Sequence, residues 1–213
     1  FHSGEKIEFN WRSIQENTQN LNFNFVYPFI FNIPLGLDYA FELYKKDTTF
    51  IDVTNKLGAQ YLLKGNNYFE LFFHNKSSNL LSQSGFPSLT TLPSYADIST
   101  QFYGIESFSS NLDYLLNPKK GYLLRISGSI GNKAIKKNPS INESLYQNVQ
   151  LKSKLYNLDL DANYYFSLGG RNVLKLRSND AFTLNENLFE NELLRIGGLK
   201  TLRGFDEESI FAS

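Results

Sequence analysis

The stretch YNLDLDANY at residues 156–164 alternates strictly between two kinds of side chain. Every second position is apolar or aromatic, namely Tyr156, Leu158, Leu160, Ala162 and Tyr164. The positions between them are polar, namely Asn157, Asp159, Asp161 and Asn163. Because successive side chains of a β-strand point to opposite faces, this pattern predicts a strand with one apolar and one polar face. Such a strand suits a soluble sheet packed on a core, or a barrel wall between lipid and a water-filled lumen.

The same alternation recurs along most of the chain and predicts an all-β fold. We expect nine strands, centred on Phe9, Leu21–Phe25, Leu35–Leu43, Val53–Leu63, Phe69–Phe73, Gln101–Ile105, Leu124–Ile130, Leu155–Phe166 and Val173–Arg177. A helical turn is expected only at Leu188–Ile196. Aromatic residues make up 15% of the sequence, which also favours strands over helices.

Composition excludes several other classes of protein. The 21 basic and 21 acidic residues cancel, so the chain lacks the positive surplus of a nucleic-acid binder. It has no cysteine, which excludes disulfides and thiolate metal ligands. The sequence contains no apolar run of about 18 residues, the length of a transmembrane helix. A transmembrane β-strand needs only about 10 residues, so a barrel stays compatible with the composition.

The lengths of the connectors favour a barrel over a soluble sandwich. We expect a medium connector at Ile14–Gln19 and short ones at Pro28–Pro34 and Lys45–Thr49. From there short and long connectors alternate, at Lys64–Asn67, Asn75–Asp97, Asn117–Gly121, Gly131–Gln147 and Leu168–Asn172. Outer-membrane barrels alternate short periplasmic turns with long external loops, whereas sandwiches have Greek-key crossings. The prediction is an antiparallel up-and-down transmembrane β-barrel with Asn157, Asp159, Asp161 and Asn163 facing its lumen.

Two motifs carry a resemblance to a known family. The stretch IGGLKTLRGF at residues 196–205 has a glycine pair, then a few residues, and then a small aliphatic residue, Arg, Gly and an aromatic residue. The positions that match this pattern are Gly197, Gly198, Leu202, Arg203, Gly204 and Phe205. It resembles the loop-6 signature of the bacterial surface-antigen barrels, the outer-membrane assembly and translocation factors of Bam/Tam type. The NPKKG turn, with Asn117, Pro118 and Gly121, resembles the periplasmic turn before that family's ninth strand. Tyr27-Pro28-Phe29 is a weaker match.

The resemblance implies both an architecture and a function. Residues 1–213 would be a single barrel-domain fragment with strands about 3 to 11 of about sixteen and the start of loop 6, without the family's periplasmic repeats. The protein would lie in the outer membrane of a Gram-negative bacterium and insert or translocate other proteins without enzymatic activity. Its partners would be outer-membrane lipid, client outer-membrane or secreted proteins and accessory lipoproteins, with no nucleic acid.

The resemblance also implies a role for Arg203, which would brace the lumen. Glycines allow a loop to approach other backbone closely, and arginine offers a planar fork of donors. A buried arginine needs an acidic partner, which the family supplies from later strands. Three alternatives stay open, which are a barrel that secretes one passenger, a passive porin, and a soluble all-β adhesin or binding module.

No catalytic, cofactor or metal site is predicted. His2 and His74 have no carboxylates at ligand spacing. Asp159 and Asp161 share one face but have no neighbouring base, and a wetted lumen explains them better. We interpret Lys133, with Lys136 and Lys137, as solvated charges of a long loop.

Overall fold

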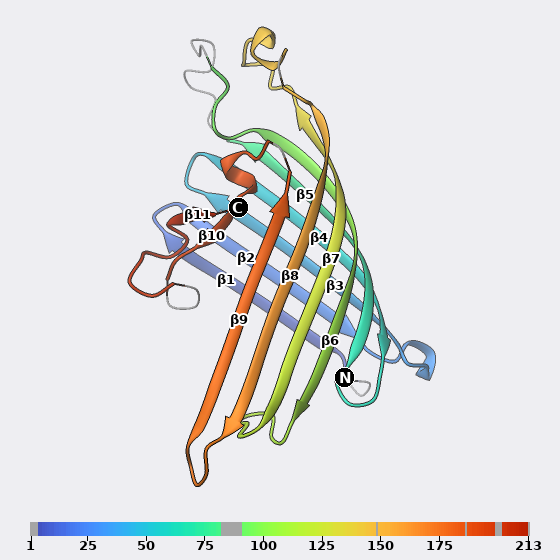
Figure 1. Cartoon of the computed structure of the whole chain (residues 1–213). Coiled ribbons are helices and arrows are strands. Elements are labelled where there is room, and N and C mark those ends of the chain that lie inside the picture. Colours follow the sequence, from blue (N-terminus) through green and yellow to red (C-terminus); the bar gives the residue numbers. More distant parts are fainter. Residues whose placement is uncertain (1–3, 82–90, 148, 186, 199–201, 213) are drawn as a thin grey trace.

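The computed structural model describes residues 4–81, 91–147, 149–185, 187–198 and 202–212. Nine strands form one antiparallel sheet in which each strand pairs with its neighbours in sequence (Figure 1). They are β1 (Lys6–Gln15), β2 (Thr18–Tyr27), β3 (Leu35–Lys46), β4 (Phe50–Leu62), β5 (Tyr68–Leu80), β6 (Asp97–Leu112), β7 (Gly121–Lys136), β8 (Lys152–Ser167) and β9 (Val173–Leu184). The predicted all-β class, the nine strands and their up-and-down order are confirmed.

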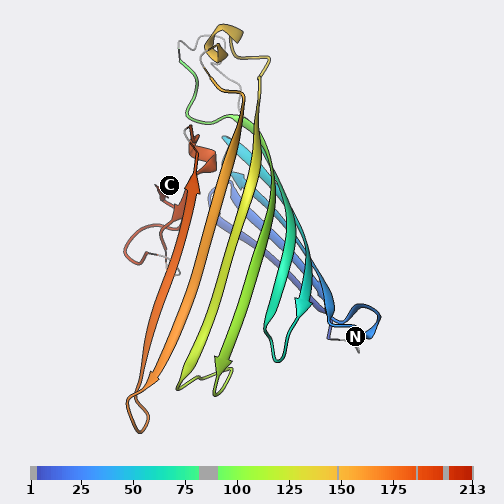
Figure 2. The same cartoon turned by 45° about the vertical axis from the view of Figure 1, so that its right-hand side comes forward.

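The sheet is strongly curved, so that it has a convex and a concave face (Figures 1 and 2). Its two edges are β1 and β9, which do not pair with each other in the described sheet. A second, two-stranded sheet of β10 (Leu194–Ile196) and β11 (Ile210–Ala212) lies on the concave side, after the 3-10 turn η4 (Glu190–Glu192). Two further 3-10 turns are η1 (Ile30–Asn32) and η3 (Glu143–Tyr146).

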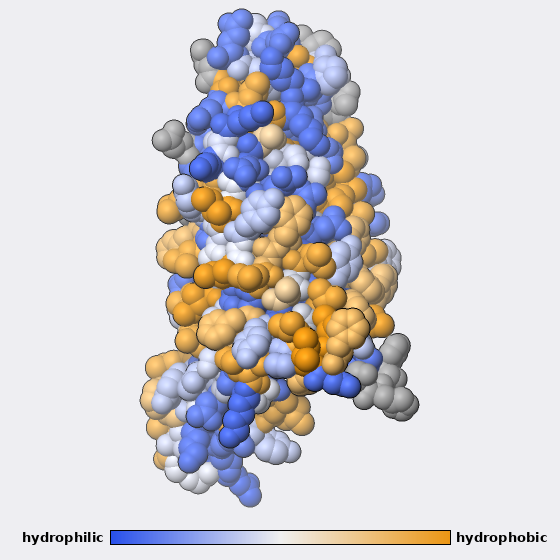
Figure 3. Space-filling model, turned by 90° about the vertical axis from the view of Figure 1, so that its right-hand side faces the viewer, coloured by the Kyte–Doolittle hydropathy of each residue, from blue (hydrophilic) through white to orange (hydrophobic). Residues whose placement is uncertain are grey.

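The register aligns apolar side chains across the convex face. One row of directly paired residues crosses all nine strands: Ile7, Phe25, Tyr39, Leu57, Phe73, Tyr103, Ile130, Tyr156 and Leu184. Figure 3 shows this face with a broad hydrophobic band, hydrophilic surface above it and a mixture of hydrophilic and hydrophobic surface below it. No helix in the described ranges is long and apolar enough to cross a membrane.

The connectors fall into two sets, one at each end of the sheet. We call the end with residues 28–34, 63–67, 113–120 and 168–172 the short-turn end, and the end with 81–96 and 137–151 the long-loop end. The predicted alternation of short and long connectors from residue 64 onward is confirmed. The medium connector predicted at Ile14–Gln19 is wrong, because the strands meet in a two-residue turn whose Asn17 has a φ of 59°.

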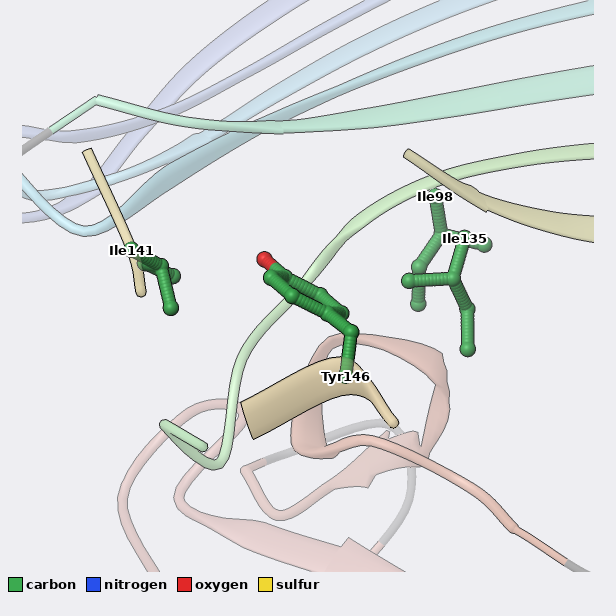
Figure 4. Packing of buried hydrophobic residues seen from close by; sticks show 5 residues of the cluster. Ile98, Ile135, Ile141 and Tyr146 are labelled. Carbon is green, nitrogen blue, oxygen red and sulfur yellow. The ribbon is translucent and has the colours of Figure 1, made fainter. Parts of the chain in front are cut away.

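Two strands run further toward the long-loop end than the sequence predicted. β5 continues to Leu80 and β7 to Lys136, so the predicted loops at Asn75–Asp97 and Gly131–Gln147 begin too early. The strands extend this far because inward-facing residues of the added segments pack against other buried side chains. Leu80, for example, packs with Tyr44 and Phe50. A second small core there joins Ala96, Ile98, Ile135, Ile141 and Tyr146 (Figure 4).

Candidate functional site on the concave face

The segment after β9 is fixed to the concave face through Asn191, which is completely buried in η4. Its Nδ2 donates to Ser78 Oγ at 2.6 Å and to the Ala96 carbonyl at 2.8 Å. Its Oδ1 accepts from the Ala96 amide at 3.3 Å, and its carbonyl accepts from Lys76 Nζ at 3.2 Å. A buried amide with these bonds satisfied defines one position for the segment.

Arg195 of β10 makes the segment's charged contacts with the sheet. Its Nη1 lies 3.5 Å from Asp52 Oδ2, and its Nε lies 3.5 Å from Glu208 Oε2. The guanidinium carbon lies 3.7 Å from the centre of the Tyr44 ring. Lys76 Nζ is a second partner of Asp52, at 3.1 Å. A planar guanidinium can stack on a ring and pair with carboxylates at its edge at the same time, so Arg195 joins three elements.

Lys133 of β7 is the second cation that binds this segment. Its side chain is 1% exposed, pairs with the Glu192 carboxylate and donates to the Asn187 carbonyl at 2.7 Å. The interpretation of Lys133 as a solvated loop charge is therefore wrong, because β7 continues past Gly131 and turns this side chain inward. Lys137 lies outside the strand, and its Nζ pairs at 2.5 Å with Glu143 at the surface.

A second charged cluster lies on the concave face nearer the short-turn end. Lys56 Nζ lies 2.7 Å from Glu70 Oε1 and 3.6 Å from Glu106 Oε2. Glu106 also accepts from Tyr68 at 2.7 Å and lies 3.6 Å from Arg125 Nε. The residues come from four consecutive strands, so their contacts depend on the register of the sheet.

The four polar residues predicted to face a lumen lie on the concave face. Ser127 Oγ donates to Asp159 Oδ2 at 3.1 Å, and Asn163 Nδ2 donates to Asp161 Oδ1 at 2.9 Å. Asn157 lines a cavity of about 360 Å³ whose wall also includes Glu192 and Arg195. The structure thus brings these strand residues onto the face that holds both charged clusters and the segment after β9.

The predicted periplasmic turn lies between β6 and β7, and an aspartate that the sequence analysis missed organises it. Asp113 Oδ1 accepts from the backbone amides of Tyr114, Lys119 and Lys120 at 2.9–3.2 Å. These bonds, that of Lys120 foremost, hold the pKa of Asp113 below its usual value. Asn117 and Pro118 lie inside this turn. An aspartate at the start of a turn is the signal that could have found it.

Gly121 ends this turn and begins β7 at a φ of 114°. A Cβ built there would lie 1.9 Å from the Asn111 carbonyl oxygen. Glycine is therefore required by both the backbone conformation and the close approach of the neighbouring strand.

The loop-6 residues lie in the connection between β10 and β11. Gly197 and Gly198 are buried with positive φ, and the Gly198 amide donates to the Phe205 carbonyl at 3.1 Å. Leu202, Arg203, Gly204 and Phe205 are exposed, and the intervening residues 199–201 lie outside the described ranges. The arginine of this hairpin that reaches the sheet is Arg195, which lies two residues before the glycine pair. Bracing of a lumen by Arg203 stays a prediction.

His74, the one histidine that the structure describes, belongs to no recognisable site. His74 stacks on Phe102 with ring centres 5.4 Å apart, and His2 lies outside the described residues. The described part of the chain has no group of three or more His, Asp or Glu residues placed to hold a metal ion.

Comparison with models of known protein families finds no match, and comparison with curated protein sequences finds none either.

Proposed function

We propose that the nine-stranded sheet is part of the wall of a membrane-embedded β-barrel in the outer membrane of a Gram-negative bacterium. The observation that carries this proposal is the inverted burial of adjacent residues on β5. Glu70 is 2% exposed on the concave face, whereas its neighbour Leu71 is 66% exposed on the convex face. In water this arrangement would leave a large apolar surface without cover, which monomeric soluble proteins rarely do. In a bilayer the same surface would face hydrocarbon.

The convex face also changes character where a bilayer would end. On β5 to β8, the next outward-facing row from Tyr103 and Ile130 toward the long-loop end is polar. It consists of Asn75, Gln101, Asn132 and Lys154. Strands β6, β7 and β8 each have 16 residues, more than the 9–11 or so that a tilted transmembrane strand needs. The excess length would extend into water at the long-loop end.

For this barrel we propose a role in inserting or translocating other proteins. The loop-6 and turn motifs support it by resemblance, and an open seam between two strands of the complete barrel would offer a client strand backbone hydrogen bonds. The segment containing Asn191 and Arg195 fills part of the concave face, which suits a regulated barrel better than a passive porin.

The test uses the full-length protein in its native membrane. We expect it to require detergent for extraction and to migrate differently on a gel before and after boiling. Its depletion should lower the amounts of several other outer-membrane or secreted proteins. Loss of one passenger alone would favour a dedicated secretor, and ion conductance without any loss of other proteins would favour a porin. A protein that is soluble without detergent would contradict the barrel itself and favour the adhesin.

A further inference from the structure

All four connectors of the short-turn end expose large apolar side chains. They are Phe29, Phe31 and Ile33 in the first, Leu63 in the second, Tyr114, Leu115 and Leu116 in the third, and Leu168 in the fourth. Phe31 and Leu116 are 90% and 86% exposed. Turns in water are normally polar, so a repeated apolar tip at one end of the sheet needs a partner that covers it.

Three of these four connectors also carry positive charge. Lys64, Lys119, Lys120 and Arg171 are all exposed, and each lies within a few residues of an exposed leucine. The one acidic residue in these four connectors is Asp113, whose carboxylate accepts backbone hydrogen bonds within its own turn. The short-turn end is therefore apolar and positively charged at once.

The long-loop end has a different chemistry. Its connectors carry acidic as well as basic residues, and the exposed Lys137 is paired with Glu143. Its large apolar residues Ile141 and Tyr146 are buried in a core of their own (Figure 4). Among the described residues, the long-loop connectors expose one large apolar side chain, Leu81, with no lysine or arginine in its connector, so the combination of several apolar tips and positive charge is seen at the short-turn end.

The apolar tips are continuous with the convex band. On β7 the outward positions Tyr122, Leu124 and Ile126 lead from the band to the turn that holds Leu115 and Leu116. That turn has a defined backbone, because Asp113 binds three of its amides. The leucines are therefore held beside the edge of the surface that would face lipid.

We propose that the short-turn end is an interfacial anchor for a leaflet rich in anionic phospholipid. This inference rests on the proposed membrane-embedded barrel. The exposed aromatic and leucine side chains enter the boundary between headgroups and acyl chains, where such groups are favoured. The lysines and Arg171 extend to the phosphates, since their long stems can lie along apolar surface while the charge stays in water.

The first experiment locates the turn relative to the bilayer. In the full-length protein, Leu116→Cys and, separately, Ile126→Cys are labelled with an environment-sensitive fluorophore, and the unsubstituted protein treated alike gives the background. Each is reconstituted in vesicles of phosphatidylethanolamine and phosphatidylglycerol that contain lipids with spin labels at the headgroup or deep in the acyl chain. We expect the shallow labels to quench at position 116 and the deep labels at position 126.

The outcomes separate the anchor from the barrel. Quenching at 126 with none at 116 overturns the anchor, leaves the barrel standing and implies a protein partner for the tips. Absence of quenching at both positions overturns the proposed membrane location itself.

The second experiment tests the selection of anionic lipid. Quenching of the label at 116 is compared between headgroup-labelled phosphatidylglycerol and phosphatidylcholine, and we expect a ratio of about two to five in favour of the anionic lipid. Lys119→Glu with Lys120→Glu should reduce the ratio to about one. The matched control, Lys136→Glu with Lys137→Glu at the long-loop end, should leave it unchanged. A ratio of about one in the unsubstituted protein, or equal loss in both double variants, overturns the proposed selectivity.

Discussion

The convex and concave faces carry alternate residues of the same strands, so they can be compared position by position. On β7, Ile130 faces outward and is 43% exposed, whereas Lys133 faces inward and is 2% exposed. A soluble sheet would bury the isoleucine and leave the lysine in water. Here the buried inward charges Glu70, Asp52 and Lys133 pair with groups from other strands or from the segment after β9, while the outward face has no cover within the described chain. The difference supports the proposal that the convex face meets lipid.

The largest expected effect comes from removing one partner of a buried concave pair. Glu192→Ala leaves Lys133 desolvated without its carboxylate, and we expect a loss of about 3–5 kcal/mol in the free energy of unfolding. The measurement is urea unfolding of the full-length protein in lipid or detergent. Glu143→Ala is the matched control, since the Lys137–Glu143 pair is mostly exposed and should contribute nothing measurable. Equal effects of the two variants would contradict the concave site.

The convex face is tested by placing a charge at two depths. Ile126→Arg puts a guanidinium in the middle of the apolar band and should destabilise the protein by about 2–4 kcal/mol in a bilayer. Asn132→Arg, on the same face of β7 but in the polar row, should cost about 0–1 kcal/mol. The measurement is the urea concentration at the midpoint of unfolding in lipid vesicles. If both variants have the same midpoint as the unsubstituted protein, the band does not face hydrocarbon.

The separation of the two faces depends on register, which Gly121 helps to fix. Gly121→Ala forces a Cβ against the Asn111 carbonyl and a positive φ on alanine, so we expect a loss of about 1–3 kcal/mol. A slip of one residue would also exchange the faces of the strand. Gly128→Ala, where an added Cβ has nothing within 4 Å, should change the stability by less than about 1 kcal/mol. Comparable unfolding midpoints for the two variants would show that the turn does not constrain β7.

The smallest effect concerns Asp113 and depends on pH. Its pKa is lowered in the folded protein, so its charged form stabilises the turn above its ordinary pKa, and this contribution is lost as the pH falls through the folded pKa. Asp113→Asn should therefore be slightly less stable than the parent at neutral pH, with the difference shrinking in acid. Unfolding midpoints measured between pH 7 and pH 3 check this, and a difference that grows in acid would refute it.

The sequence predicted those features that repeat with a local period. Alternation along Tyr156–Tyr164 placed the polar residues of β8 on one face, and turn residues such as Gly121 marked where strands meet. It failed where a residue's environment is set by a distant segment. Lys133 looks like part of a basic loop in sequence, yet its partner Glu192 lies 59 residues away. Asn191 gives no signal at all, because only the fold brings Ser78 and Ala96 to it.

The resemblance to the loop-6 signature stays a prediction. Gly197 and Gly198 have positive φ, and the Gly198 amide donates to the Phe205 carbonyl. The arginine that meets Asp52 is Arg195, which belongs to β10 and has no part in the motif. A short motif predicts the local backbone, whereas the choice of the side chain that reaches the sheet depends on how the hairpin docks.

The most direct test of the account is a spin-label scan along β7 of the reconstituted full-length protein. Each residue from Leu124 to Ile130 is changed in turn to a labelled cysteine, and its accessibility to oxygen and to a water-soluble nickel complex is measured. We predict a period of two, with positions 124, 126, 128 and 130 reached by oxygen from the lipid and positions 125, 127 and 129 reached from water. Equal access of the nickel complex to both sets would contradict a lipid-facing convex surface and, with it, the membrane-embedded barrel.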